Sequence, residues 1–397
     1  VILLSSFLIY TSARRRAQIK ETEAISKAYD GDMNEIYTNI IEENDPLISF
    51  FDTTYGRIDV IWIDLENNVI DKPLAPILNG MTPVKWNGIT EITTNENDTS
   101  WYNYTGKEGA EDNRESKWAN AKDSKGSYFV WIPRYAYRIT YYNNEERVIP
   151  TGYCDGRGIV DNKGNIKYKL DEGTEIVKTD DKSYIVHPAF ETNLDLGGWE
   201  KDLAGIWVGK YESSGSISDL KIIPETRSFG AIMNDAYTSA YNYNRNKESH
   251  LIKNSEWRAV AYLTYSQYGR NGNEIDINNS SSYITGNGGG SVDASSQSGE
   301  PNPYNTDIGQ KASSTGNIYG IYDLSGGKYE RVAIFNAKSN NLVYGNEFAS
   351  TNGSSTKYAT AYVNSSETKS GRKIYEVGKI GDATKEVYTN YERKKLE

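Results

Sequence analysis

The sequence predicts an α+β head with much irregular structure, preceded by an N-terminal helix. Strand-like runs of aromatic and β-branched residues occur at residues 58–65, 128–139 and 206–212. Apolar residues at helical spacing follow at residues 229–243 and 254–266. The sequence around these elements is rich in Gly, Ser and Asn, which favours turns and loops. We therefore expect short strands, two helices in the head and long connections.

The first 46 residues form the predicted N-terminal helix. Residues 1–10 are apolar, although a membrane-spanning helix needs roughly 20 such residues. A charged helical stretch follows, and two interpretations remain open. One is a truncated membrane anchor with a helix beside the membrane. The other is a pilin-like helix, because ARRRAQIKETEAISKAYD after an apolar segment resembles the N-terminal helix of type IV pilins and pseudopilins. The second interpretation implies filament partners.

The rest of the chain is divided into a strand and linker, residues 47–79, and a head, residues 80–397. Within the head, residues 141–183 read as an insertion, where DNKGNIKY indicates a β-hairpin. We expect one strand pair around Pro133, at an edge or bulge because proline cannot donate to a ladder. Another strand pair is expected within residues 316–335.

The two predicted helices have candidate caps, Ser228 for the first and Asn254 for the second. Between the second helix and the next strand pair lie nearly fifty residues with almost no aliphatic side chains. A loop of that length in a packed head is usually functional or mobile. Strand-like fragments recur at residues 358–363 and 374–377.

The composition predicts a core built largely from tyrosine and tryptophan. The chain of 397 residues has 32 Tyr and 8 Trp against 8 Phe, and only 37% of its residues are hydrophobic when Tyr is included. Tyr and Trp rings can be buried while their polar edges stay near water or a hydrogen-bond partner. Binding surfaces and shallow cores use side chains of this kind.

Charge and residue counts exclude several function classes. The net charge of −10 argues against nucleic-acid binding, which needs clustered Lys and Arg. One cysteine, Cys154, and two histidines allow neither an internal disulfide nor a Cys/His zinc site. His187 precedes a proline in an apolar stretch and His250 precedes a predicted helix, so we expect both to be structural.

Three segments in order carry a resemblance: GIWVGKYE (205–212), HLIKNSEWRAVAYLTYSQYG (250–269) and GNIYGIYDLSGGKYERV (316–332). This order resembles the formylglycine-generating-enzyme-like, or sulfatase-modifying-factor, family, which implies a C-type-lectin-like fold for the head. The head also resembles surface proteins of Gram-positive gut bacteria. The family's enzymes use a pair of active-site cysteines, and only Cys154 is present, so the resemblance implies a scaffold that is not an enzyme.

No cofactor is expected from the resemblance. Calcium is the ion that its motifs would suit, but Gly327 occupies the position of a family Asn whose oxygen could serve a calcium site. Glu300, Asn302 and the proline between them match the tripeptide with which mannose-type lectins bind calcium and sugar hydroxyls. Asp276 and Asp293 in the same loop could add oxygen ligands. The alternative reading of the tripeptide is an ordinary turn.

Further candidate binding residues are the Tyr, Glu and Asn side chains that the loops of such a fold would display. Tyrosine provides contact area at low entropic cost, and asparagine provides adaptable hydrogen bonds. The ligand-binding set is Glu300, Asn302, Tyr304, Tyr329, Glu330, Asn336 and Tyr344.

Asp323 and Glu330 could alternatively pair across the glycine turn as acid and base. In the structural interpretation, Asp323 instead binds backbone amides of the turn. Trp257 is expected in the core, because Val260 and Ala261 share its helix face.

From these observations we expect a non-catalytic binding or adhesion protein that is extracellular and anchored at the cell surface by its N-terminus. Its expected partners are a glycan, a peptide or a host or cell-surface protein, and not nucleic acid. A pilin-like structural subunit and a carboxylate-based enzyme are the alternatives.

Overall fold

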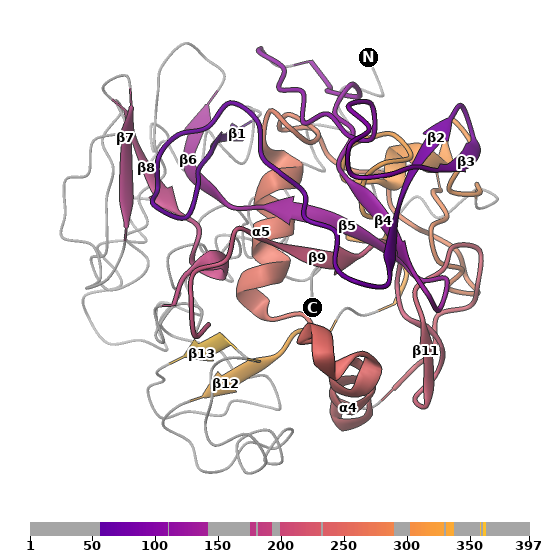
Figure 1. Ribbon diagram of the computed structural model, residues 1–397. Coiled ribbons are helices and arrows are strands. Elements are labelled where there is room, and N and C mark those ends of the chain that lie inside the picture. Colours follow the sequence, from indigo (N-terminus) through magenta and orange to yellow (C-terminus); the bar gives the residue numbers. More distant parts are fainter. Residues whose placement is uncertain are drawn as a thin grey trace, which may run out of the picture.

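A computed structural model describes residues 56–109, 111–141, 175–179, 182–192, 199–231, 233–289, 302–328, 331–336, 358 and 360–362. These residues form a mixed structure of antiparallel sheets, two α-helices and extensive loops, as the α+β prediction requires (Figure 1). None of the helices in these ranges has the length and apolar character needed to span a membrane. The predicted N-terminal helix, the hairpin of the insertion and Cys154 lie outside the described residues.

Two antiparallel sheets form the framework. The order of the four-stranded sheet is β1-β6-β8-β7, with β1 at Gly56–Trp62, β6 at Tyr135–Tyr141, β7 at Ile176–Thr179 and β8 at Lys182–Val186. The order of the five-stranded sheet is β3-β2-β4-β5-β9, with β2 at Met81–Asn87, β3 at Thr90–Thr93, β4 at Asn120–Asp123, β5 at Tyr128–Pro133 and β9 at Gly205–Gly209. β1 lies in the segment read as strand and linker, and it pairs with β6 along its whole length.

The strands on both sides of Pro133 are present, but the prediction that they pair with each other was wrong. β5 and β6 belong to different sheets. Arg134 lies between them and is completely buried. Its guanidinium donates to the carbonyl oxygen of Phe190 at 2.8 Å and to the Asp202 carboxylate at 3.1 Å. These contacts anchor the point where the chain passes from one sheet to the other.

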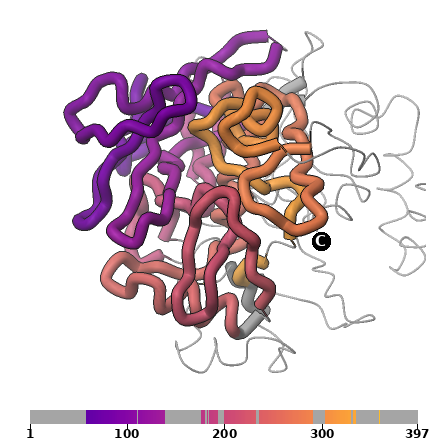
Figure 2. Tube along the Cα trace, turned by 90° about the vertical axis from the view of Figure 1, so that its right-hand side faces the viewer, coloured from indigo at the N-terminus to yellow at the C-terminus, as the bar shows by residue number. Residues whose placement is uncertain are grey.

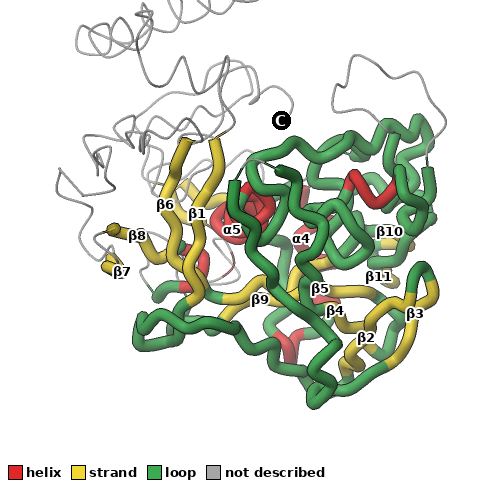
Figure 3. The backbone as a smooth tube through the Cα atoms, turned by 90° about the horizontal axis from the view of Figure 1, so that it is seen from above, coloured by secondary structure: helices red, strands yellow, loops and turns green. Residues whose placement is uncertain are grey.

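Helix α5 (Asn254–Tyr265) joins the two sheets, since it packs against both β1 and β5 (Figure 3). Almost all of its residues are buried. The predicted cap Asn254 is the first helical residue. Lys253 occupies the cap position, and its backbone N–H donates to the Glu256 carboxylate at 2.8 Å.

Helix α4 (Met233–Tyr243) begins four residues later than predicted, because Ser228 is engaged elsewhere. The Ser228 backbone and side chain both donate to the carbonyl oxygen of Tyr283. The smaller elements are the 3-10 helices η1 (Pro188–Phe190), η2 (Arg245–Lys247) and η3 (Gly309–Ala312), the hairpin of β10 (Ser214–Ser216) with β11 (Asp219–Lys221), and the parallel pair of β12 (Ile334–Asn336) with β13 (Thr360–Tyr362).

The prediction of a strand pair within residues 316–335 was also wrong. Of these residues, the described ones contain only the start of one strand, β12. The described residues from 302 to 328 instead form loops and one 3-10 helix, and they pack against residues 270–289 (Figure 2). Backbone hydrogen bonds join the two segments, for example from Asp276 to Lys311 at 3.1 Å and from Asn278 to Ser325 at 2.9 Å. The described parts of the aliphatic-poor stretch are therefore built into the body of the head.

Tyrosine and tryptophan do fill the core. The largest fully buried side chains are mostly aromatic: Trp62, Trp101, Trp118, Tyr135, Tyr137, Tyr262, Tyr322 and Phe190. Several of these rings donate to a main-chain carbonyl from their polar edge. Tyr135 Oη donates to Ala259 at 2.7 Å and Trp101 Nε1 to Asn120 at 2.8 Å. Such edges satisfy carbonyl groups that a sheet or helix would otherwise satisfy.

Lys210, directly after β9, provides the most concentrated set of these bonds. Its side chain is completely buried, and its ammonium donates to Asn120 Oδ1 at 2.8 Å and to the carbonyl oxygens of Ile318 and Gly320 at 2.6 and 2.9 Å. Burial lowers the pKa of Lys210 well below its ordinary value. The three oxygens match the three N–H donors of the ammonium, which offsets part of the desolvation cost.

Replacing this lysine should destabilise the fold strongly. In Lys210→Met the unbranched side chain keeps all but its last heavy atom and leaves three buried acceptors without a donor, so we expect a loss of about 3 kcal/mol in the free energy of unfolding. Urea denaturation of the full chain, followed by tryptophan fluorescence, measures it. The matched control Lys178→Met removes an exposed lysine and should change stability by less than about 0.5 kcal/mol. Equal stability of the two variants would contradict the assignment.

Candidate functional site

The described residues enclose a pocket between strand β9 and the two α-helices. Its volume is about 810 Å³. One wall is formed by β9 and its neighbour β5, and the opposite wall by α4, the connection from α4 to α5, and the first turns of α5. This volume falls within the range of pockets that hold drug-sized ligands, roughly 300–1,000 Å³. We call this pocket the β9 groove.

β9 meets the groove with its edge rather than with one face. Among the described strands it is the last of its sheet, and all five of its residues line the groove and are partly exposed. Successive side chains of a strand point to opposite faces, so five consecutive residues can reach one groove only along the edge. Trp207 lies in the middle of this edge, between Gly205 and Gly209.

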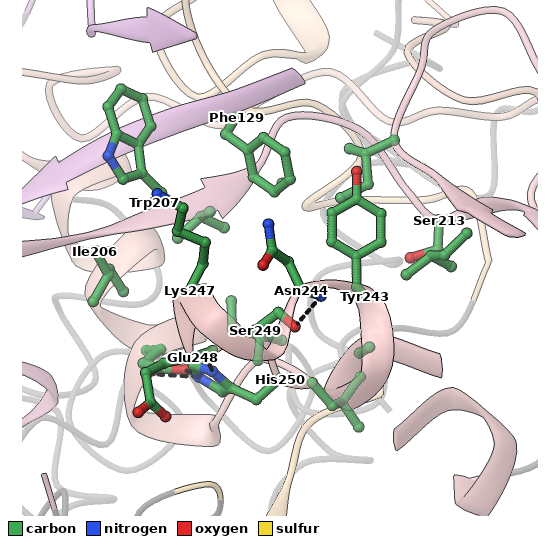
Figure 4. Close-up of a pocket in the computed structure, with 18 of the residues that line it drawn as sticks. Phe129, Ile206, Trp207, Ser213, Tyr243, Asn244, Lys247, Glu248, Ser249 and His250 are labelled. Atoms are coloured by element: carbon green, nitrogen blue, oxygen red, sulfur yellow. Dashed lines mark hydrogen bonds and ion pairs between the residues drawn. The ribbon is translucent and has the colours of Figure 1, made fainter. Parts of the chain in front are cut away.

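Aromatic rings line the groove on both sides (Figure 4). Phe129 on β5 and Tyr243 at the end of α4 are 6.2 Å apart between ring centroids, and Trp207 packs against Trp131 at 5.4 Å. The Trp207 indole N–H donates to the carbonyl oxygen of Pro76 at 3.1 Å, which holds the ring at the groove's margin. These rings offer apolar contact area to a ligand.

The connection between α4 and α5 adds polar groups to the opposite wall. Asn244, Lys247 and Glu248 line the groove together with His250 (Figure 4). The Asn244 backbone N–H donates to Ser249 Oγ at 2.7 Å, which closes the connection on itself. Acidic and basic side chains both occur here, so the groove offers no single sign of charge.

His250 is held between two oxygen atoms. Its Nδ1 lies 2.6 Å from the carbonyl oxygen of Glu248, and its Nε2 lies 2.9 Å from the Glu256 carboxylate. Burial alone would raise the pKa of Glu256, but the neighbouring His250 and Lys253 outweigh it, and the pKa is lowered. The pair ties the groove wall to the first turn of α5. His187, by contrast, is completely buried, and its Nδ1 accepts from the Ala189 backbone at 3.2 Å.

Two of the predicted ligand-binding residues have structural partners and do not themselves line the β9 groove. Tyr304 packs at 5.6 and 6.1 Å from the rings of Tyr211 and Tyr322, and its carbonyl oxygen accepts from Tyr322 Oη at 2.7 Å. Asn302 exchanges backbone hydrogen bonds with Gly288 at 2.9 and 2.7 Å. Asn336, the third predicted ligand-binding residue that the structure describes, is the last residue of β12. These contacts bring Asn302 and Tyr304 into the packed loops.

The other predicted ligand-binding residues, Glu300, Tyr329, Glu330 and Tyr344, lie outside the described residues, and so does Asp293. The lectin-type calcium site, which the sequence analysis weighed against an ordinary turn, involves these residues and stays a hypothesis, as does the expectation of no cofactor. Asp276 is buried, and its backbone N–H donates to Lys311.

Asp323 is buried and binds a backbone amide, as the structural interpretation expected, but this amide belongs to the distant residue Gly286 and not to the turn that follows Asp323. Its carboxylate accepts from the Gly286 backbone N–H and from Asn278 Nδ2, both at 2.8 Å. Burial raises the pKa of Asp323 to about 6. Its proposed partner Glu330 lies outside the described residues, so the acid–base pairing stays a hypothesis. Trp257 is buried as predicted, and it also lines the β9 groove.

The sequence predicted a strand at β9 but did not indicate that the edge of this strand could form a site. No residue type marks an open edge, since pairing is decided by the topology of the sheet. One signal was present in the sequence. GIWVG has three large apolar residues between two glycines, and it lacks the charged residues and prolines that usually protect an exposed edge.

The Glu256 carboxylate can be tested by Glu256→Gln, which keeps an acceptor for the Lys253 backbone but removes the charge. We expect a loss of about 2 kcal/mol in the free energy of unfolding at pH 7, because the buried carboxylate loses its charge and with it the favourable interactions with His250 and Lys253 that lower its pKa. The folded-state pKa is depressed, so the carboxylate's contribution is complete above its unfolded pKa and disappears as the pH falls through the folded value.

The stability gap between the wild type and Glu256→Gln should therefore narrow below about pH 4.5. Urea unfolding at pH 7 and in acid measures this gap. Glu66→Gln, which changes an exposed carboxylate, is the control and should leave stability nearly unchanged at both pH values. A gap that stays constant with pH would contradict the stabilising role of the charged Glu256 carboxylate.

Comparisons with known proteins found no match to a protein-family model and no match to a curated protein sequence.

Proposed function

We propose that this chain is a non-catalytic binding protein of the cell surface, and that its ligand binds in the β9 groove. The observation that carries the proposal is the groove itself, about 810 Å³ with aromatic walls along an open strand edge. Pockets of this size with apolar walls and a few polar groups at the margin are the usual form of binding sites. The sequence reading favoured binding by Tyr- and Asn-rich loops. The Tyr304 ring packs against Tyr211 and Tyr322 instead of being displayed on its loop, and this favours the groove.

The proposed scaffold is C-type-lectin-like, of the formylglycine-generating-enzyme-like kind. Its support is that the three resembling segments lie in one body. Lys210 follows β9 and binds the carbonyl oxygens of Ile318 and Gly320 in the third segment. Ile321 of that segment packs in the same core cluster as Val260 of α5. Export and an N-terminal anchor remain parts of the proposal that rest on residues 1–46.

The alternatives depend on residues beyond the described ranges. A pilin-like subunit would need the helix of residues 1–46 to dock on the head, and a carboxylate-based enzyme would need Glu330 to face Asp323. The groove gives direct grounds for binding, and we rank binding first.

The test is to screen the full chain against a glycan array and a random-peptide array, each with and without calcium. We expect at least one class of ligand to be bound by the wild type. Ala240→Phe places a ring on the half-buried groove wall and should weaken that binding tenfold or more. Ile89→Phe adds the same ring at an exposed site outside the groove and should leave binding unchanged.

Either of two results would overturn the proposal. One is the absence of binding on both arrays. The other is binding that Ala240→Phe leaves intact while its circular dichroism spectrum matches that of the wild type. Loss of binding on calcium removal would contradict the expectation of no cofactor, and binding that a chelator leaves unchanged would remove the lectin-type role of Glu300 and Asn302.

A further inference from the structure

We infer that the ligand of the β9 groove is an extended peptide, which adds to the five-stranded sheet as a further strand along β9. This inference rests on the proposed binding function and names its ligand class. It is carried by the direction of the backbone groups of β9, the absence of charge and proline in its sequence, and the chemistry of the opposite wall.

The hydrogen-bonding pattern of β5 decides which groups of β9 face outward. The Trp131 backbone N–H donates to Ala119, next to β4, at 2.9 Å, so this residue faces away from β9. Antiparallel strands alternate between hydrogen-bonded and non-hydrogen-bonded pairs. Val130 and Ile132 therefore face β9, where their register partners are Val208 and Ile206.

It follows that Trp207, the register partner of Trp131, directs its backbone N–H and C=O toward the open side. The bond from the Lys210 N–H to Tyr128 at 3.0 Å agrees with this alternation, because Lys210 lies two residues beyond Val208 and, like Val208, faces β5. Gly205 and Gly209 share the phase of Trp207. The groove thus contains main-chain donors and acceptors at the two-residue repeat that a strand supplies.

β9 also lacks the features with which proteins protect an exposed edge. Its sequence GIWVG has no charged residue and no proline, and the lysine that follows is buried inside the head. An incoming strand would lie about 4.8 Å from β9. Beyond it, the α4 wall presents Ala236 and Ala240, whose small side chains leave room for the side chains of a peptide.

The aromatic and charged groups define the peptide further. Phe129, Trp207 and Tyr243 favour apolar side chains at alternate positions, and the mixed charges of the opposite wall favour no strongly charged sequence. A glycan could stack on the same rings, but it cannot supply alternating N–H and C=O groups at strand spacing. The open edge therefore favours a peptide over a glycan.

The test begins with a random heptapeptide library selected on the full chain. We expect enriched peptides with apolar residues at every second position. The tightest one is then synthesised as a series in which each backbone amide is methylated in turn. Methyl groups on alternate amides should weaken binding tenfold or more, and those on the intervening amides should change it less than threefold, because only every second N–H faces β9.

Hydrogen exchange of the protein provides a second measurement with the chain unaltered. Bound peptide should slow exchange of the Trp207 amide at least tenfold, whereas the Val208 amide, already bonded to β5, serves as the internal control. Sensitivity to N-methylation without a two-residue repeat, or an unchanged Trp207 amide, would overturn strand addition.

The outcomes separate this inference from the proposed function. If only glycans bind, and Ala240→Phe abolishes their binding, the function stands and the peptide assignment falls. If neither class binds, both fall. If the chain dimerises in sedimentation experiments and Ala240→Phe prevents it, a second copy occupies the groove and the peptide assignment falls.

Discussion

The buried ammonium of Lys210 is the interaction on which most of the head depends. Much of the head is loop, and loop carbonyls have no ladder to supply their donors. Lys210 supplies three donors at the place where β4, the end of β9 and the loop around Ile318 and Gly320 converge. Its own carbonyl oxygen accepts from the Tyr322 backbone at 2.9 Å, so the loop is bound in both directions. One side chain thereby fastens an irregular segment to the sheet.

The same arrangement accounts for the asymmetry of β9. On the inner side, pairing with β5 and the bond from the Lys210 N–H to Tyr128 hold the strand in register, and α5 packs against β5. The outer side has no strand partner among the described residues. A strand that is rigid on one edge and open on the other pays little conformational entropy when a ligand binds, which is the general advantage of a preorganised site.

The sequence predicted local structure better than it predicted pairing. The runs around Pro133, the strand at β9 and the helix at α5 were recognisable because their apolar spacing is local. Pairing of β5 with β6 failed because the buried Arg134, bonded to Phe190 and Asp202, turns the chain into a second sheet. The strands expected in residues 316–335 failed because Lys210 satisfies carbonyls that a ladder would have used. Both errors come from buried cations whose partners are distant in sequence.

The same difference between local features and strand pairing applies to the candidate site. Residue types that often bind ligands, such as Asn302 and Tyr304, are visible in a sequence, yet here they bond to neighbouring loops and rings. The open edge of β9 depends on where a strand falls in its sheet, and no side chain encodes that directly. His250 illustrates the intermediate case, because its bond to Glu256 serves the fold while its ring lines the groove. A head of this kind can therefore change its ligand preference through the residues on the groove walls, while Lys210 and the backbone of β9 keep the edge in position.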